Sequence, residues 1–185
     1  FMSKSMKKIY MDYASSADTK SANAGSVHDF GVREKNKLET ARMDVSKIVN
    51  AHTNEIVFTS GSTESNNLAI LGLVQNFKNP HIITTKIEHS SVLEVFRHLE
   101  KNKQAQVTYV SVESNGKVLP EKIKKVLTKD TVLVSVMYAN NEIGTIQPVK
   151  EIVKEIRHYN KTNNTKIYLH TDATQAINYL PINVE

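Results

Sequence analysis

Short apolar runs that are typical of buried strands alternate with segments of helical apolar spacing along most of this chain. The strands are expected at residues 55–59, 81–85, 106–112, 131–137 and 166–170, and the helices at 33–50, 63–75, 90–101, 120–127 and 149–159. Successive strands joined by helices form right-handed crossovers, which produce a parallel sheet with helices on both faces. We therefore predict an α/β fold with a mostly parallel sheet flanked by helices.

The composition excludes several classes of protein. With 185 residues, 39% of them hydrophobic and 23% charged, the chain can bury a hydrophobic core, and its composition argues against a disordered tail. It has no cysteine, which excludes disulfides, zinc–cysteine sites, iron–sulfur ligation and a thiol nucleophile within these residues. The net charge is +5, but the lysines are scattered and often lie beside glutamates, so we expect a solvated surface and no nucleic-acid partner.

The sequence also argues against a membrane partner. The longest apolar runs, such as Leu68–Val74, fall far short of the ~20 residues that span a bilayer. Phe1–Lys8 carries positive charge but lacks the apolar segment of a secretory signal. We expect a cytoplasmic protein.

Four polar segments follow expected strands, where ligands bind in sheets of this kind. In residues 59–67 (TSGSTESNN) a strand turns through glycine into a helix, which suits an anion such as phosphate. A simple helix cap by Ser62 or Thr63 explains the same residues equally well. In residues 87–91 (IEHSS), His89 begins a helix, and a single histidine there is more often a capping group than a catalyst.

The other two segments are also ambiguous alone. The adjacent amides Asn140 and Asn141 could orient a ligand, although closing a loop through Asx turns is the commoner role. Asp172 emerges from the last strand, where it is either a buried acid with a cationic partner or an exposed cap of the next turn. His170 and Asp172 could share a metal, but two ligands without a third make zinc improbable, so we predict no metal site.

Taken together, the four segments predict a site for pyridoxal 5'-phosphate (PLP). The phosphate would lie at a helix N-terminus, an imidazole would stack on the ring, and an amide would bond the ring oxygen. A carboxylate would pair with the pyridinium nitrogen and keep it protonated, so that the ring acts as an electron sink.

Four motifs in register carry a resemblance to a known family. They are residues 55–71 (EIVFTSGSTESNNLAIL), 87–89 (IEH), 135–148 (SVMYANNEIGTIQP) and 170–176 (HTDATQA). With the opening at residues 9–14 (IYMDYA) and the segment at 23–31 (NAGSVHDFG), they closely resemble the cysteine desulfurases of the NifS/IscS type. These are class V aminotransferase-like PLP enzymes of fold type I, and the resemblance implies the large-domain fold of that type.

The resemblance implies roles for six residues at matching motif positions. Ser62 and Thr63 would hold the cofactor phosphate, and His89 would stack on the pyridine ring and serve as a catalytic acid or base. Asp172 would pair with the pyridinium nitrogen, Gln175 would bond the phenolic oxygen, and Asn141 would lie beside the cofactor oxygen and the substrate carboxylate. His28 lies in the family's substrate-side loop, but we assign it no role.

The sequence departs from the family pattern in three ways. The family's Schiff-base lysine follows a Ser-x-His-Lys motif that these residues lack, and its nucleophilic cysteine lies on a small C-terminal domain. The segment between Ala14 and Asn23 is also shorter than in the family. We therefore expect an abbreviated N-terminal arm at residues 1–31, an incomplete PLP-binding large domain at 32–185, and no small domain.

The resulting interpretation is the N-terminal, cofactor-binding part of a cysteine desulfurase, inactive alone. The family converts L-cysteine to L-alanine and passes the sulfur to an iron–sulfur scaffold or another acceptor such as a tRNA-thiolation enzyme, and its members are homodimers. Three alternatives stay open: a non-catalytic PLP- or phosphate-binding or dimerisation module, another class V PLP enzyme such as a selenocysteine lyase, and a chain that has lost PLP with the lysine.

Overall fold

The computed structural model describes residues 9–11 and 22–184. Most of the predicted N-terminal arm, including the shortened segment between Ala14 and Asn23, therefore lies outside the described residues. The chain divides into two compact units, one of Phe1–Val57 with Ile182–Glu185 and one of Phe58–Pro181. The predicted domain boundary between residues 31 and 32 stays a prediction.

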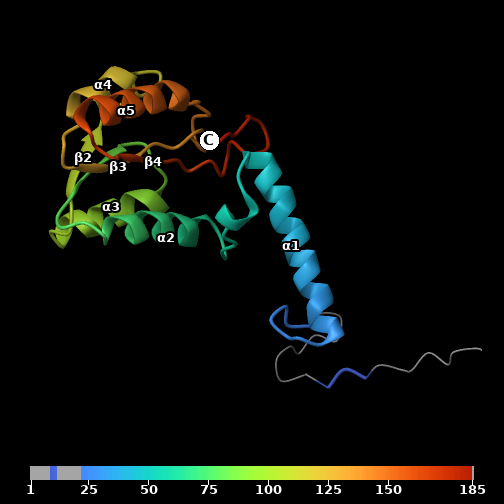
Figure 1. The fold of residues 1–185 in the computed structure, drawn as a ribbon. Helices are drawn as coiled ribbons and strands as arrows, with labels where there is room; N and C mark the ends of the chain where they lie inside the picture. The colour runs from blue at the N-terminus through green and yellow to red at the C-terminus, as the bar shows by residue number, and fades with distance from the viewer. Residues whose placement is uncertain (1–8, 12–21, 185) are drawn as a thin grey trace, which may run out of the picture. The chain divides into compact units, whose positions relative to one another are not determined.

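The larger unit is built on a four-stranded parallel sheet, as predicted (Figure 1). Its strands are β1 (His81–Thr85), β2 (Gln106–Val110), β3 (Thr131–Ser135) and β4 (Tyr168–His170). They lie in the order β2-β1-β3-β4, and every neighbouring pair is parallel. All five residues of β1 and of β3 are buried, as expected for central strands covered on both faces.

Two pairs of helices cover the sheet, one pair on each face (Figure 1). The helices are α2 (Ser62–Val74) and α3 (Ser90–Lys101) on one face, and α4 (Pro120–Val126) and α5 (Val149–Asn163) on the other. Phe96 and Ile82 belong to the core beneath α2 and α3, and Ile123 and Ile152 to the core beneath α4 and α5. Each such side chain contributes about 1.5–3 kcal/mol on burial, so both layers hold the sheet in place.

The predicted strand at 55–59 is wrong. The structure has a short 3-10 helix at Thr53–Glu55, and Ile56–Phe58 pair with no strand in the described part of the chain. The apolar, β-branched composition of this segment favours a strand, but a strand forms only where a neighbour supplies backbone hydrogen bonds. Both sides of the central strands β1 and β3 are already occupied by other strands.

In the smaller unit, helix α1 (Asp29–Val49) begins four residues earlier than the predicted helix. His28 explains the early start, because its Nδ1 accepts a hydrogen bond from the backbone N–H of Gly31 over 3.2 Å. The helix ends at Val49, and its C-cap Asn50 adopts the left-handed conformation with φ of 53°.

The order of the strands creates a switch point. The chain passes from β1 to β2 on one side, and then returns so that β3 lies on the other side of β1. In open α/β sheets the crevice beyond the carboxyl ends of two such strands is the usual place for a ligand. His89 follows β1 and Asn141 follows β3, so both lie at this end of the sheet.

Among the described residues, no helix combines the length and apolar character needed to cross a membrane.

Candidate functional site

A small hollow of about 130 Å³ lies at the carboxyl end of the sheet. Its lining comes from the N-terminus of α2 and from the segments after β1, β3 and β4: Ser62, His89, Met137, Ala139, Asn141, Asp172, Thr174 and Gln175. Five of the six predicted site residues are among them. A wider hollow of about 480 Å³ adjoins it and shares Ser62, Asp172 and Thr174.

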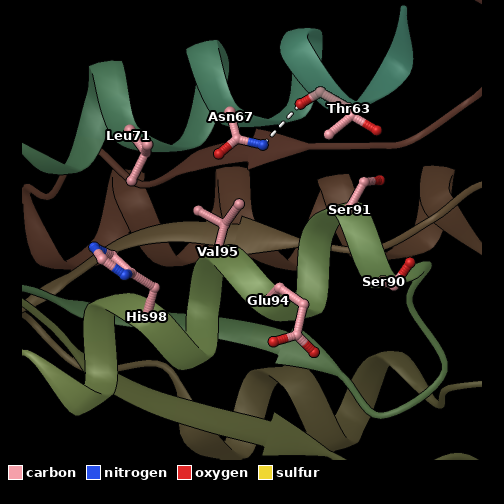
Figure 2. Close-up of a pocket in the computed structure, with 8 residues that line it drawn as sticks. All are labelled: Thr63, Asn67, Leu71, Ser90, Ser91, Glu94, Val95 and His98. Carbon is pink, nitrogen blue, oxygen red and sulfur yellow. Dashed lines mark hydrogen bonds between the residues drawn. The ribbon is translucent and has the colours of Figure 1, made fainter.

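The sixth predicted residue, Thr63, lines a different hollow. The groove between α2 and α3 has a volume of about 560 Å³ and is shown in Figure 2 with Thr63 at one end and His98 toward the other. Ser91, at the start of α3, also lines this groove. The predicted role of Thr63 therefore stays a prediction that rests on its place in the first turn of α2.

The N-terminus of α2 is not capped by a side chain. Gly61 is the N-cap, and the hydroxyls of Ser62 and Thr63 make no hydrogen bond within the described part of the chain. Glu64 turns back instead, and its Oε2 accepts bonds from Ser60 N and Ser60 Oγ, both over 2.6 Å. The first N–H groups of a helix carry partial positive charge, so this end can receive an anion.

His89 is the N-cap of α3, which confirms the capping role that a lone histidine suggested. Its Nδ1 accepts the backbone N–H of Ser91 over 3.2 Å and lies 2.8 Å from Ser91 Oγ. A backbone N–H can only donate, so Nδ1 carries the lone pair and the neutral ring holds its hydrogen on Nε2. The exposed ring also lines the hollow, so capping and ligand contact are compatible.

The two adjacent asparagines have separate tasks. Asn140 is buried and closes its loop, because its Oδ1 accepts the backbone N–H groups of Glu142 and Ile143 over 2.9 and 3.0 Å. Its Nδ2 donates to Ile87 O over 3.1 Å, which ties this loop to the segment before His89. Asn141 is exposed and lines the hollow.

Asp172 is half-buried and combines both roles that the sequence left open. Its Oδ1 accepts the backbone N–H of Thr174 over 3.0 Å and caps the next turn. Its Oδ2 accepts Asn66 Nδ2, also over 3.0 Å. Burial alone would raise the pKa of Asp172, but the hydrogen bonds from Asn66 and Thr174 and the nearby His170 lower it overall. The carboxylate is therefore held in its charged form.

Backbone bonds beyond the strand ends hold Asp172 in place. Val136 N donates to His170 O over 3.0 Å and Tyr138 N donates to Asp172 O over 2.9 Å, so the pairing of β3 with β4 continues into the site. His170 lines the wider hollow, and its Nδ1 lies 2.8 Å from Ser135 Oγ of β3. Within the described ranges, no three histidine, aspartate or glutamate side chains gather in a way that would hold a metal.

Glu88 is a buried acid beside the site. The sequence alone assigned this residue no role. It is 5% exposed, and its Oε1 accepts Thr85 Oγ1 over 2.6 Å and Met137 N over 2.9 Å. Among the described residues, its Oε2 has no hydrogen-bond partner. Burial, helped by the charge of Asp172, raises the pKa of Glu88 to about 7 against these two hydrogen bonds. The side chain therefore exchanges its proton near neutral pH.

Asn66 was missed as well, although its spacing could have revealed it. Asn66, Ile70 and Val74 are the buried residues of α2 and recur every four positions, so the asparagine lies in an apolar helical stripe. A polar side chain in such a stripe needs buried partners. The sequence could not say which partners these are, because they come from α3 and from the segment after β4.

The comparisons with known proteins agree with this architecture. The family model described as "Aminotransferase class-V" matches residues 2–185. The chain belongs to the class V aminotransferase family.

Within this family, the relatives are cysteine desulfurases, which confirms the resemblance seen in the motifs. Cysteine desulfurase IscS of Dictyoglomus turgidum is 41% identical over 195 residues, which cover 97% of this chain and 48% of that protein. The chain spans about half the length of the curated relatives of this type.

Solved structures of the family have the same fold. A "NifS-like protein" superposes with a TM-score of 0.80 at 40% identity. The superposition covers 88% of this chain and 44% of that protein's chain. A structure described as "SspA in complex with cysteine" has a TM-score of 0.83 at 32% identity, and covers 94% of this chain and 48% of its own. The predicted fold class is confirmed.

Proposed function

We propose that this chain forms the PLP-binding face of a cysteine desulfurase. The observation that carries the proposal is the convergence of Ser62, His89, Asn141, Asp172 and Gln175 around one hollow at the switch point of the sheet. These residues come from four separate segments of the chain, so local helix capping or loop closure does not account for their meeting.

The donor set fits the cofactor. A carboxylate that is held charged is the partner that a protonated pyridine nitrogen needs, and Asp172 is such a group. The uncapped start of α2, with the unengaged hydroxyls of Ser62 and Thr63, offers hydrogen-bond donors to a phosphate. His89 brings a flat ring to the same hollow, and the polar side chains of Asn141 and Gln175 lie exposed on its rim.

Each residue has a task in this proposal. Asp172 would keep the pyridine nitrogen protonated. Gln175 would donate a hydrogen bond to the phenolic oxygen of the ring, and Asn141 would lie beside this oxygen and the substrate carboxylate. Because Nδ1 of His89 is occupied by Ser91, the Nε2 atom is the one that exchanges a proton with a ligand. The cofactor, when bound, supplies an electron sink for the substrate.

For the complete protein we propose the activity of its relatives. L-cysteine would be converted to L-alanine, with the sulfur delivered through an enzyme cysteine to an iron–sulfur scaffold or another acceptor protein. The present residues hold no cysteine, so that thiol must come from another segment or chain. We further propose a cytoplasmic homodimer.

Titration with pyridoxamine 5'-phosphate tests the cofactor assignment. This amine form has the ring and phosphate of PLP but does not condense with surface lysines. We expect saturable binding by the chain, and an Asp172→Ala variant should bind roughly 10- to 150-fold more weakly, because a hydrogen bond to a charged group contributes of the order of 1.5–3 kcal/mol.

Asp130→Ala is the matched control, since Asp130 lies at the opposite end of the sheet, just before β3. It should bind like the unmodified chain. Absence of saturable binding, or equal affinity of Asp172→Ala and Asp130→Ala, would overturn the assignment.

A further inference from the structure

Asn66 is the only polar residue among the buried positions of α2, and it is 4% exposed. A buried amide that lacked partners would cost about 1–3 kcal/mol, so its bonds account for its presence in an apolar stripe. The same nitrogen, Nδ2, donates to Ser91 Oγ over 2.9 Å and to Asp172 Oδ2 over 3.0 Å. Its two hydrogens are therefore both used, one toward α3 and one toward the segment after β4.

The orientation of this amide has only one acceptable choice. If its oxygen and nitrogen were exchanged, Oδ1 would face the carboxylate of Asp172, which is held in its charged form. Two acceptors at that separation repel each other, so the nitrogen must face Asp172.

This choice also sets the direction of the next hydrogen bond. Ser91 Oγ accepts from Asn66, which leaves its own hydrogen for His89 Nδ1 at 2.8 Å. Asp172, Asn66, Ser91 and His89 thus form one directed chain of hydrogen bonds. The first and last members line the same hollow.

We propose that Asn66 is a positioning residue that holds the Asp172 carboxylate and, through the Ser91 hydroxyl, the His89 ring in fixed relation in the lining of the hollow that would receive the cofactor ring. This inference rests on the proposed function for the identity of the ligand. It adds a residue that does not line the small hollow, and it assigns a direction to each hydrogen bond of the chain.

Nuclear magnetic resonance of the ligand-free chain tests the hydrogen-bond chain itself. The side-chain amide hydrogens of Asn66 should exchange with solvent about tenfold more slowly than those of Asn67, because one Asn66 bond is buried and the other part-buried, whereas the Asn67 bond is exposed. Long-range ¹H–¹⁵N spectra of the neutral His89 ring should show Nδ1 without hydrogen and Nε2 with it.

Variants test the positioning role, with Asn67→Ala as the matched control. Asn67 is the next residue of α2, and its amide donates to Thr63 O in its own helix (Figure 2). In Asn66→Ala, the carboxyl titration of Asp172 should move to higher pH, and affinity for pyridoxamine 5'-phosphate should fall about tenfold. Asn67→Ala should change neither. A merely structural asparagine would lower stability without moving the Asp172 titration.

The outcomes separate this inference from the proposed function. If the chain binds no pyridoxamine 5'-phosphate, the proposed function fails, while the exchange, tautomer and titration measurements still decide the role of Asn66. If Asn66→Ala does not fold, the exchange and tautomer measurements on the unmodified chain decide. Fast exchange of both Asn66 hydrogens, hydrogen on His89 Nδ1, or identical Asp172 titration in the two variants would each overturn the inference.

Discussion

The backbone N–H of Met137 donates to the Glu88 carboxylate over 2.9 Å, which ties the segment after β1 to the end of β3. Met137 and the neighbour of Glu88, His89, both line the proposed cofactor hollow. The bond therefore joins two of the segments that line the site at the switch point of the sheet. The same bond holds a buried acid whose second oxygen has no hydrogen-bond partner in the part of the chain that the structure describes.

Glu88 makes stability fall as the pH rises through its titration range. Its pKa is raised by burial from 4.5 to about 7, so the folded chain binds more protons than the unfolded chain between these values. Between pH 4.5 and 7, wild type should lose stability relative to Glu88→Gln, by an amount of the order of 3 kcal/mol. Urea unfolding at a series of pH values measures this, and a parallel pH dependence of the two proteins would contradict it.

His170 should titrate below its ordinary value of 6.5, because burial lowers its pKa and the charge of Asp172 only partly opposes this. Its contribution to stability is therefore lost as the pH falls below 6.5. Asp172→Asn should lower the His170 midpoint further, as read from histidine resonances.

Asp130→Asn provides the reciprocal control for this titration. It should leave His170 unchanged and lower the midpoint of His81, whose pKa is already lowered by burial and partly restored by Asp130. A His170 titration midpoint above 6.5, or a midpoint that does not change in Asp172→Asn, would contradict the effects of burial and of the Asp172 charge on the pKa of His170.

Packing of α3 on the sheet should dominate the stability of the larger unit. Phe96 is fully buried in the core beneath α2 and α3, so Phe96→Ala should cost about 3–5 kcal/mol in chemical unfolding. Phe77→Ala removes the same ring from a position that is 41% exposed and should cost far less. Equal losses would mean that this core does not hold the unit together.

The 185 residues alone should release no sulfide from L-cysteine, because they contain no thiol nucleophile. Borohydride reduction in the presence of PLP should trap no specific PLP–lysine adduct at the proposed site. Sulfide production by a pure preparation, measured over a blank with free PLP, would contradict this. The assay needs no variant, since the missing cysteine is itself the reason for the expected result.

The sequence predicted those helices and strands that their own apolar pattern is enough to identify. Residues 81–85 and 90–101 form a strand and a helix with the predicted bounds, because buried β-branched residues and a helical apolar stripe identify each without outside help. The segment 55–59 has an equally suitable composition but is not a strand. Strand formation depends on a pairing partner, which no local pattern supplies.

The candidate site shows the same limit. The motifs predicted that His89, Asn141 and Asp172 belong to one site, and all three line one hollow. Which of Asn140 and Asn141 closes the loop and which faces the hollow depends on the side chain that the loop turns inward. The link from Asn66 to Asp172 joins residues that are 106 positions apart. Only the packing of α2 beside the carboxyl end of β4 brings such residues together.

The most direct test of the proposed site is to follow the backbone amide resonances of the chain during titration with pyridoxamine 5'-phosphate. We expect one saturating curve to describe the shifts of six backbone amides, those of Ser62, Thr63, His89, Asn141, Asp172 and Gln175. Shifts confined to the α2–α3 groove around Glu94 and His98, or no saturating shift at all, would contradict it.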